Sequence, residues 1–409
     1  MKCRHCRKEL EHVFLDLGFA PPSNAYLTRE QLNAPEVTLP LRLFVCDNCW
    51  LVQTEDFTRP SDLFDFDYAY YSSTSKTWLA HASAYVENVT QRFALDSNSF
   101  VVEIASNDGY LLRNFLRPGI PCLGIEPAHG TAQAAERLGI PVLREFFNSA
   151  LARRLAAEKK ADLIIGNNVF AHVPDINDFA LGMRELLKED GVITLEFPHL
   201  MQLIDNNQFD TVYHEHFSYL SLHVVQRIFA AAGLRVWDVD ELPTHGGSLR
   251  VYGCHAGARR ETQANVPALL AREAAGGLLR LDHYMAFQKK ADRVKDDLLM
   301  FLVEQKRAGR SVAAYGAAAK GNTLLNYAGV KPDLLSFVCD AAAAKQGKYM
   351  PGSHVPILKP DAIRERKPDF VLILPWNIAS EVRQQNDYVR EWGGRFVVAV
   401  PRLEVLGPA

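Results

Sequence analysis

The segment Thr211–Ser221 holds the residues best suited to proton transfer. Four consecutive side chains there can ionise or form hydrogen bonds: Tyr213, His214, Glu215 and His216. Histidine exchanges protons near neutral pH, a neighbouring carboxylate can orient an imidazole, and a phenol can donate to a developing oxyanion. A polar surface turn between buried aromatic residues would explain this segment alone equally well. The rest of the chain must therefore supply a pocket before acid–base chemistry is expected here.

Two CxxC pairs near the start of the chain predict a metal site. Cys3 and Cys6 form the first pair, and Cys46 and Cys49 form the second. Four thiolates in two such turns can occupy the corners of a tetrahedron, as structural zinc requires. A closed four-thiolate site has no open position, so the expected Zn²⁺ is structural. The alternative is two coincidental CxxC turns.

Strands alternate with helices from residue 100 to residue 196, which predicts a parallel, doubly wound sheet. The expected strands are 100–104, 123–126, 142–143, 161–166 and 191–196. Such sheets bind ligands at the carboxyl ends of their strands. Polar or small residues at or near those ends are Glu103, Asn107, Asp108, Gly109, Glu126, Asn167 and His172.

The first loop of this unit reads Glu103-Ile-Ala-Ser-Asn-Asp-Gly109, without the GxGxxG pattern of dinucleotide-binding folds. Glu103 and Glu126 suit a ligand with an amino group and a ribose diol but no pyrophosphate. S-adenosylmethionine (SAM) meets that description. Each carboxylate alone could instead cap a strand. Phe146 and Phe147 follow the third strand, where they could stack on adenine or pack in the core.

Three other regions shape the expected site. Tyr68 and Tyr70 lie in an aromatic stretch, residues 56–75, that either covers an adjoining domain or forms a lid. Apolar residues recur at helical spacing from just after Pro267 to Arg310, which predicts a long helix. Residues 311–400 repeat the α/β pattern, and Lys320 at the start of a helix would suit a phosphate. The alternative is a ligand-free sheet that only supports the first one.

Composition narrows the class of protein. At 409 residues the chain is expected to contain two or three domains, and 48% hydrophobic with 23% charged residues is ordinary for a folded soluble protein. A net charge of −3 argues against a general nucleic-acid binder. The chain shows neither a signal peptide nor an apolar run of the roughly 20 residues that cross a bilayer. We expect a cytoplasmic protein with no nucleic-acid or membrane partner.

Together these motifs resemble the SAM-dependent sugar C-methyltransferases, which act on nucleotide-linked 4-keto deoxysugars. The likeness covers nearly the whole chain and rests on the two CxxC pairs, Glu103–Gly109, Gly124–Pro127, Asn167–Pro174, Tyr213–Phe217, His245–Arg250 and Tyr315–Gly321. The resemblance implies an α/β protein with a zinc-binding module at residues 1–75, a Rossmann-like SAM domain at 76–300 and a pseudo-Rossmann domain at 301–409. These would enclose one cleft in a monomer.

The resemblance also implies a reaction and its residues. Carbon C3 of a dTDP-linked sugar, made acidic by the C4 ketone, would lose a proton to His216 and then attack the methyl group of SAM. Glu215 and Tyr213 would position the base or contact the sugar, while Tyr68, His172 or Tyr213 would donate to the C4 oxygen. The expected cofactor contacts are Glu103, Ala105, Asn107, Gly109, Tyr110, Leu111, Glu126, Pro127, Phe146, Phe147, Asn167, Asn168 and His172. The expected substrate contacts are Tyr70, His199, His214, His245, Gly247, Ser248, Arg250, Tyr315, Lys320 and Asn322.

Three other functions are compatible with parts of the sequence. A SAM-dependent O- or N-methyltransferase would use the same cofactor without needing a carbon acid. A zinc-ribbon interaction protein would carry the α/β layers without binding SAM. An NAD-linked sugar-nucleotide enzyme is disfavoured because GxGxxG is missing.

Overall fold

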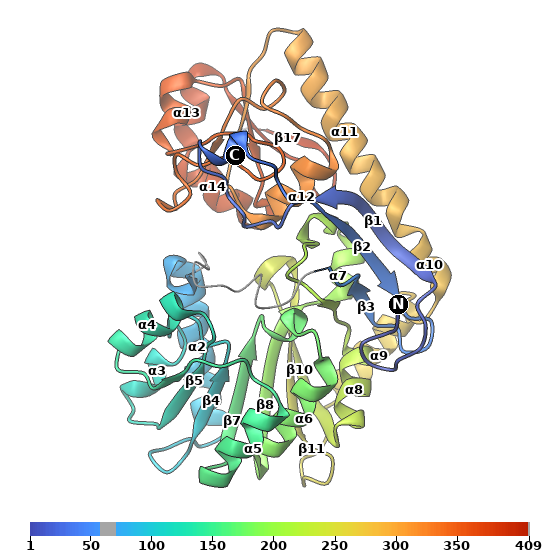
Figure 1. Cartoon of the computed structure of the whole chain (residues 1–409), viewed down its shortest axis with the longest axis vertical. Helices are drawn as coiled ribbons and strands as arrows, with labels where there is room; N and C mark the ends of the chain where they lie inside the picture. The colour runs from blue at the N-terminus through green and yellow to red at the C-terminus, as the bar shows by residue number, and fades with distance from the viewer. Residues whose placement is uncertain (58–70, 408–409) are drawn as a thin grey trace.

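Three β-sheets organise residues 1–57 and 71–407, which are the residues that the computed structural model describes (Figure 1). A seven-stranded sheet forms the lower lobe of Figure 1, and a six-stranded sheet belongs to the upper lobe. A four-stranded sheet runs along the right-hand side between them. This arrangement confirms the expected α/β fold with an N-terminal zinc-binding module.

The four-stranded sheet joins the start of the chain to its middle. Its strands, in spatial order, are β1 (His12–Ala20), β2 (Leu39–Val45), β3 (Val52–Thr54) and β9 (Ser218–Tyr219), all antiparallel. Strand β9 follows the Tyr213–Phe217 segment directly and pairs with β3, so that Gln53 lies opposite Ser218. The N-terminal module therefore contributes to the position of the Tyr-His-Glu-His segment.

The seven-stranded sheet has the order β10-β11-β8-β7-β4-β5-β6. Its strands are β4 (Val101–Ile104), β5 (Cys122–Ile125), β6 (Val142–Leu143), β7 (Ala161–Asn167), β8 (Leu187–Pro198), β10 (Leu234–Leu242) and β11 (Ser248–His255). The first five are parallel, whereas β11 runs antiparallel to both of its neighbours. The chain order reverses between β4 and β7, and in such sheets the ligand crevice forms at that reversal.

Helices cover both faces of this sheet because successive strand residues point to opposite sides. Leu163 and Ile165 pack in the same core as α2, whereas Ile164 packs in the core shared with α5 and α6. The helices are α2 (Lys76–Arg92), α3 (Arg113–Leu116), α4 (His129–Arg137), α5 (Ser149–Glu158), α6 (Ile176–Leu186) and α8 (Leu222–Ala231). Helix α7 (Leu200–Asp205) packs instead in the core that contains the N-terminal sheet. Side chains cap several of these helices: Asn148 accepts from the Leu151 amide at the start of α5 (2.8 Å), and Asp175 from the Asp178 amide at the start of α6 (3.0 Å).

The six-stranded sheet has the order β14-β13-β12-β15-β16-β17, parallel except for its last strand. Its strands are β12 (Val312–Tyr315), β13 (Val338–Cys339), β14 (Ile357–Leu358), β15 (Phe370–Ile373), β16 (Arg395–Val398) and β17 (Glu404–Leu406). Its helices are α12 (Ala319–Tyr327), α13 (Asp361–Arg366) and α14 (Ala379–Gln385). The expected second α/β unit is therefore present.

Three helices connect the two lobes where the sequence predicted one long helix. They are α9 (Asn265–Ala275), α10 (Leu281–Met285) and α11 (Phe287–Arg307). The first break falls at Gly276 and Gly277, and Gly277 has a φ of +96°, which no helix interior allows. Helix α11 packs against the N-terminal sheet, with Phe14 stacked on Phe287 at 5.0 Å between ring centroids.

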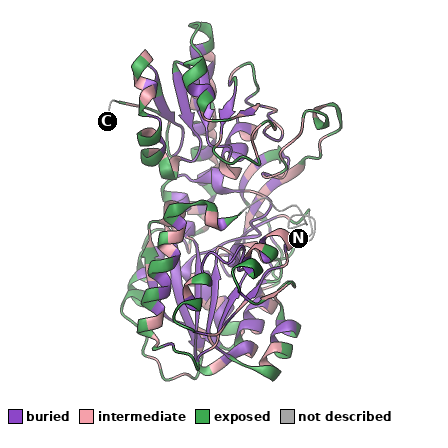
Figure 2. Cartoon of the chain, turned by 90° about the vertical axis from the view of Figure 1, so that its left-hand side faces the viewer, coloured by how far each residue is buried: buried purple, intermediate pink, exposed green. Residues whose placement is uncertain are grey.

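The buried residues lie mainly in the sheets, and the exposed residues on the outer helix faces (Figure 2). No helix within the described part of the chain is both long and apolar enough to cross a membrane.

Candidate active site and zinc site

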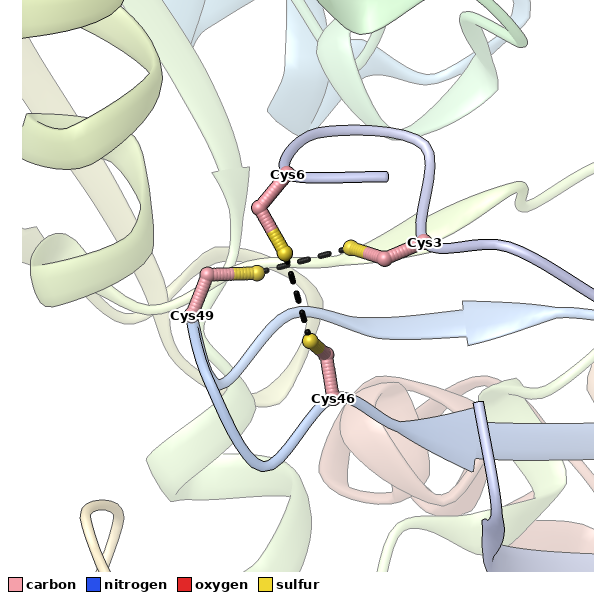
Figure 3. A group of neighbouring side chains, drawn as sticks. All are labelled: Cys3, Cys6, Cys46 and Cys49. Atoms are coloured by element: carbon pink, nitrogen blue, oxygen red, sulfur yellow. Dashed lines mark hydrogen bonds between the residues drawn. The ribbon is translucent and has the colours of Figure 1, made fainter. Parts of the chain in front are cut away.

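The four cysteines of the CxxC pairs converge at one point (Figure 3). Their Sγ atoms all lie within 4.8 Å of one another, with Cys3 and Cys49 3.4 Å apart and Cys6 and Cys46 3.5 Å apart. Zinc–sulfur bonds of about 2.3 Å give a tetrahedron with edges of about 3.8 Å, so the four thiolates fit Zn²⁺ closely. The predicted ligand set is thus brought together by the fold.

A cavity of about 820 Å³ lies where the three sheets meet, at the carboxyl ends of β4, β5 and β7. Residues from the start of the chain, from the seven-stranded domain and from the C-terminal domain all line it. The predicted residues among them are Ala105, Asn107, Tyr110, Glu126, Pro127, Phe146, Phe147, Asn167, Asn168, His172, Tyr213, Glu215, His216, His245 and Lys320. Tyr68 and Tyr70 fall outside the described residues.

The end of the cavity near β4 and β5 is acidic. Glu126 follows β5 and accepts hydrogen bonds from the backbone amides of Asn107 and Ala128, both at 2.9 Å. Burial raises the pKa of Glu126. Glu103 is fully buried in β4, and burial together with the charges of Glu126 and Asp108 raises its pKa well above the ordinary value.

Buried polar atoms at this end fit SAM. Within residues 1–57 and 71–407, neither carboxylate oxygen of Glu103 accepts a hydrogen bond, and Asn167 neither accepts one at Oδ1 nor donates one from Nδ2. Such groups cost free energy when they are left unpaired. The ammonium group and the ribose hydroxyls of SAM offer donors to the Oδ1 atom of Asn167. The positive charge of SAM complements the carboxyl groups of Glu126, in the lining, and of Glu103, buried behind it.

Strained backbone gathers around the cavity. Four lining residues other than glycine have positive φ: Ala105 (58°), Asn107 (50°), Asn168 (52°) and His245 (54°). This region is unfavourable for side chains with a Cβ atom, and such strain is often found at functional sites. The surrounding packing must therefore enforce these conformations.

Two histidines face each other at the centre of the cavity. The rings of His172 and His216 are 4.5 Å apart between centroids, and the Tyr213 ring lies 4.1 Å from that of His216. The Nδ1 of His172 lies 2.8 Å from the Glu215 carbonyl oxygen, which can only accept, so Nδ1 carries the proton and donates. Burial lowers the pKa of His172 to about 4.

His216 is also held neutral. Burial lowers its pKa well below the ordinary value, and the nearby His172, His245 and Lys320 lower it further. An uncharged imidazole at neutral pH is able to take up a proton. The geometry therefore allows His216 to act as a base towards a ligand in this cavity.

The carboxyl group of Glu215 titrates near neutrality. Burial raises its pKa to about 7, and a hydrogen bond of 2.8 Å from the Asn24 side chain opposes that shift. The segment that carries it is fixed from two other modules. Thr323 donates to the Val212 carbonyl at 2.7 Å, and Thr54 donates to the His216 carbonyl at 3.2 Å.

The C-terminal domain places two lysines at the cavity. Lys320 begins α12, and its Nζ atom donates to the Asn377 side chain at 2.7 Å and lies 4.6 Å from the centroid of the Trp376 ring. Burial lowers the pKa of Lys320. Lys345 follows β13 and donates to the Ala317 carbonyl at 2.8 Å. This end of the cavity is suited to an anion.

Two predicted substrate residues instead interact with buried carboxylates of the protein itself. His199 is 1% exposed, and its Nε2 lies 2.7 Å from the carboxylate of Glu273. Arg250 donates to Glu196, a residue of β8, and lies over the Tyr85 ring at 4.4 Å. Neither residue lines the cavity. The structure therefore places both side chains outside the cavity lining, with their partners within the protein.

Three other predicted substrate residues are turned away from the cavity. The His214 ring faces the carbonyls of Leu39 and Pro40, so neighbouring residues of the segment point in different directions. Asn322 donates to the carbonyl of Ser23, and Tyr315 packs inside the C-terminal core. The remaining predicted residues outside the cavity lining are Glu103, Gly109, Leu111, Gly247 and Ser248.

Some lining residues were not predicted from the sequence. Asn24, Ser72, Trp78 and Lys345 line the cavity but belong to no recognised motif. Lys345 does follow a parallel strand, β13, of the expected second α/β unit, so its position was a usable signal. Asn24 gave no such signal, because it reaches Glu215 from another module.

Family models match the chain along most of its length. They are "Putative zinc binding domain" at residues 3–64, "Methyltransferase domain" at 78–239 and "C-methyltransferase C-terminal domain" at 243–401. C-methyltransferase NovU from Streptomyces niveus is 34% identical over 406 residues, which cover 99% of this chain and 96% of NovU. The chain belongs to the C-methyltransferase family.

This C-methyltransferase uses SAM and carries a structural zinc site, as predicted. Membership of the family also disfavours the O- or N-methyltransferase, interaction-protein and NAD alternatives. Solved methyltransferases resemble part of it more distantly. One from Clostridium acetobutylicum has 13% identity over 43% of this chain and 91% of its own, with a TM-score of 0.34. Magnesium protoporphyrin IX methyltransferase from Synechocystis, with bound SAH, has 12% identity over 43% and 83%, with a TM-score of 0.35.

Proposed function

We propose that this C-methyltransferase methylates carbon C3 of a dTDP-linked 4-keto deoxysugar and so forms a branched-chain sugar. The observation that carries the proposal is the position of His216. Its neutral ring lies in the same cavity as the acidic residues near β5 and the lysines of the C-terminal domain. A ligand that joins a carbon acid to a diphosphate can place its sugar at the histidines and its charge at the lysines.

The residues divide the reaction between them. His216 takes the proton from C3, which is acidic because it adjoins the C4 ketone. The charge that then develops on the C4 oxygen is stabilised by hydrogen-bond donors, for which Tyr213 and His172 are the lining candidates. SAM supplies the electrophilic methyl group. Glu126, Asn107 and Asn167 orient it, and correct alignment of the reacting groups accounts for much of such a rate.

The substrate class is tested with purified protein, SAM and a panel of dTDP- and GDP-linked 4-keto sugars. The expected product is heavier by one methyl group, and a dTDP-linked sugar gives the fastest turnover. In deuterium oxide without SAM, deuterium should enter the carbon next to the ketone. Methylation of an oxygen or nitrogen without such exchange would contradict the proposal.

His216→Asn separates base chemistry from binding. We expect kcat to fall by about 10²- to 10⁴-fold, the usual contribution of a general base, while the Kd for SAM changes little. His354→Asn is the matched control, because His354 pairs with Glu36 away from the cavity and has a φ of 58°, which asparagine tolerates. Wild-type turnover in His216→Asn would falsify the assignment of the base.

A further inference from the structure

Arg4 lies inside the first zinc-binding turn, between Cys3 and Cys6, yet its side chain points into the protein. The side chain is 4% exposed, and all five of its N–H donors are used. Nε donates to the Phe217 carbonyl (3.0 Å), Nη1 to the Pro174 carbonyl (3.1 Å) and Nη2 to the Thr54 carbonyl (3.0 Å). Each terminal nitrogen also donates to the carboxylate of Asp56.

Two of these three carbonyls belong to the segments that carry the facing histidines, and the third, from Thr54, belongs to β3. Phe217 follows His216 directly, and Pro174 lies two residues after His172. The guanidinium group also lies over the Phe217 ring, 5.1 Å from its centroid. One rigid, planar side chain therefore fixes the backbone beside both rings, whose centroids are 4.5 Å apart.

Two further contacts hold the same turn in place. The Asn177 side chain, at the start of α6, donates to the carbonyls of Arg4 (3.3 Å) and His5 (2.9 Å). The Arg4 amide donates to the Gln53 side chain at 2.9 Å, and Gln53 pairs with Ser218 next to Phe217. The backbone of the first zinc-binding turn is thus also held by two residues, Asn177 and Gln53, that lie close to the histidine segments.

We propose that Arg4 is a positioning residue for the His172–His216 pair, and that the zinc-binding turn serves catalysis by presenting it. The role in turnover rests on the proposed function. The physical reason is that Arg4 donates hydrogen bonds to carbonyls of both segments at once and so fixes the distance between them. Water molecules could donate to each carbonyl separately without fixing that distance. Loss of the side chain should leave both histidines present but misaligned.

The test compares Arg4→Met and Arg4→Lys with Arg227→Met in the zinc-loaded enzyme. Arg227 is the matched control because it donates to the Asn48 carbonyl (2.9 Å), in the second zinc-binding turn, from α8. We expect Arg4→Met to keep its zinc and to bind SAM within about twofold of wild type, because misalignment acts on turnover rather than on binding. Its kcat should fall about 10- to 100-fold, with KM for the sugar nearly constant. Arg4→Lys should recover part of the loss, since an ammonium group reaches fewer carbonyls, and Arg227→Met should lose none.

A second readout does not depend on the substrate. The Cε1–H resonances of His172 and His216, assigned with Asn variants, should shift in Arg4→Met and stay in place in Arg227→Met. If no sugar is methylated by the wild-type protein, the proposed function fails, while these resonances still test the role of Arg4 in positioning. Unchanged resonances in Arg4→Met, unchanged kcat, or loss of zinc from that variant would each overturn the proposal. If Arg4→Met does not fold, Arg4→Lys carries the same test.

Discussion

In both α/β units a carboxylate residue follows the second strand, but only the carboxylate of the first unit lines the cavity. In the first unit Glu126 follows β5 and accepts from the amides of Asn107 and Ala128. In the second unit Asp340 follows β13 and accepts from the amides of Ala317 and Ala342 at 2.7 and 2.8 Å. Each carboxylate thus fixes the loop after the first strand and the turn that follows itself.

The difference lies in what remains available to a ligand. Glu126 lines the cavity, with Ala105, Asn107 and Pro127 beside it. Asp340 is shorter, does not line the cavity and is compensated by Lys345, 3.6 Å away. With Lys345 paired to Asp340, Lys320 is the lysine that leaves this end of the cavity a positive charge. The same backbone arrangement can therefore serve a cationic ligand at one end and an anionic ligand at the other.

Glu126→Ala removes the carboxylate at the acidic end and should have the largest effect on ligand affinity of the changes at the two ends. A hydrogen bond to a charged group is worth about 1.5–3 kcal/mol, so the Kd for SAM should rise about 10- to 100-fold. Asp340→Ala is the matched control, because it removes the equivalent carboxylate without touching the acidic end. Titration calorimetry with SAM measures both variants. Equal effects of the two changes would mean that Glu126 only supports the loop.

Lys320→Met should weaken the basic end by a smaller amount. We expect the Kd for a dTDP-linked sugar to rise about 10-fold at low salt and less at high salt, because ions screen a partly accessible charge. The Kd for SAM should stay within about twofold of wild type, since Lys320 lies at the other end. Lys331→Met, an exposed lysine bonded to the Gly352 carbonyl, serves as the control. A loss of SAM affinity as large as the loss of sugar affinity would contradict this division.

The sequence predicted features that depend on neighbours in the chain. The four cysteines, the strands of both α/β units and the position of Glu126 after a strand follow from spacing and periodicity. The direction in which each histidine side chain points does not follow from spacing or periodicity. His199 was predicted to contact substrate, but its direction is set by Glu273, a residue of α9 far along the chain.

Contacts between modules were equally invisible in the sequence. The sequence places Arg4 inside a CxxC pair and gives no sign of its partners, because Pro174 and Phe217 lie in loops far along the chain. From the sequence, Arg250 could contact an anion or form a strand-end salt bridge, and in the structure it pairs with Glu196 on the adjacent strand β8. Buried charges need partners, but a sequence does not tell which distant residue provides one.

Binding of ligands at the two ends of the cavity should change the number of bound protons in opposite directions. This is the smallest of the expected effects. Burial raises the pKa values of Glu103 and Glu126 and lowers that of Lys320. A positive ligand beside the carboxyl groups favours their ionised forms, so SAM binding should release protons and tighten as pH rises through those raised pKa values. An anionic diphosphate favours the charged form of Lys320, so sugar binding should take up protons and weaken as pH rises.

Calorimetry in buffers of different ionisation enthalpy measures both signs. SAM should be titrated between about pH 5 and 7, where its α-amino group stays protonated. We expect the wild-type protein to release a fraction of a proton when SAM binds. In Glu126→Gln that release should vanish if Glu126 loses the proton, and persist if Glu103 does. Proton uptake on SAM binding, or release on sugar binding, would show that charge does not distinguish the two ends. Shape alone would then determine which ligand binds at which end, and the lysines of the C-terminal unit would have a role other than binding an anion.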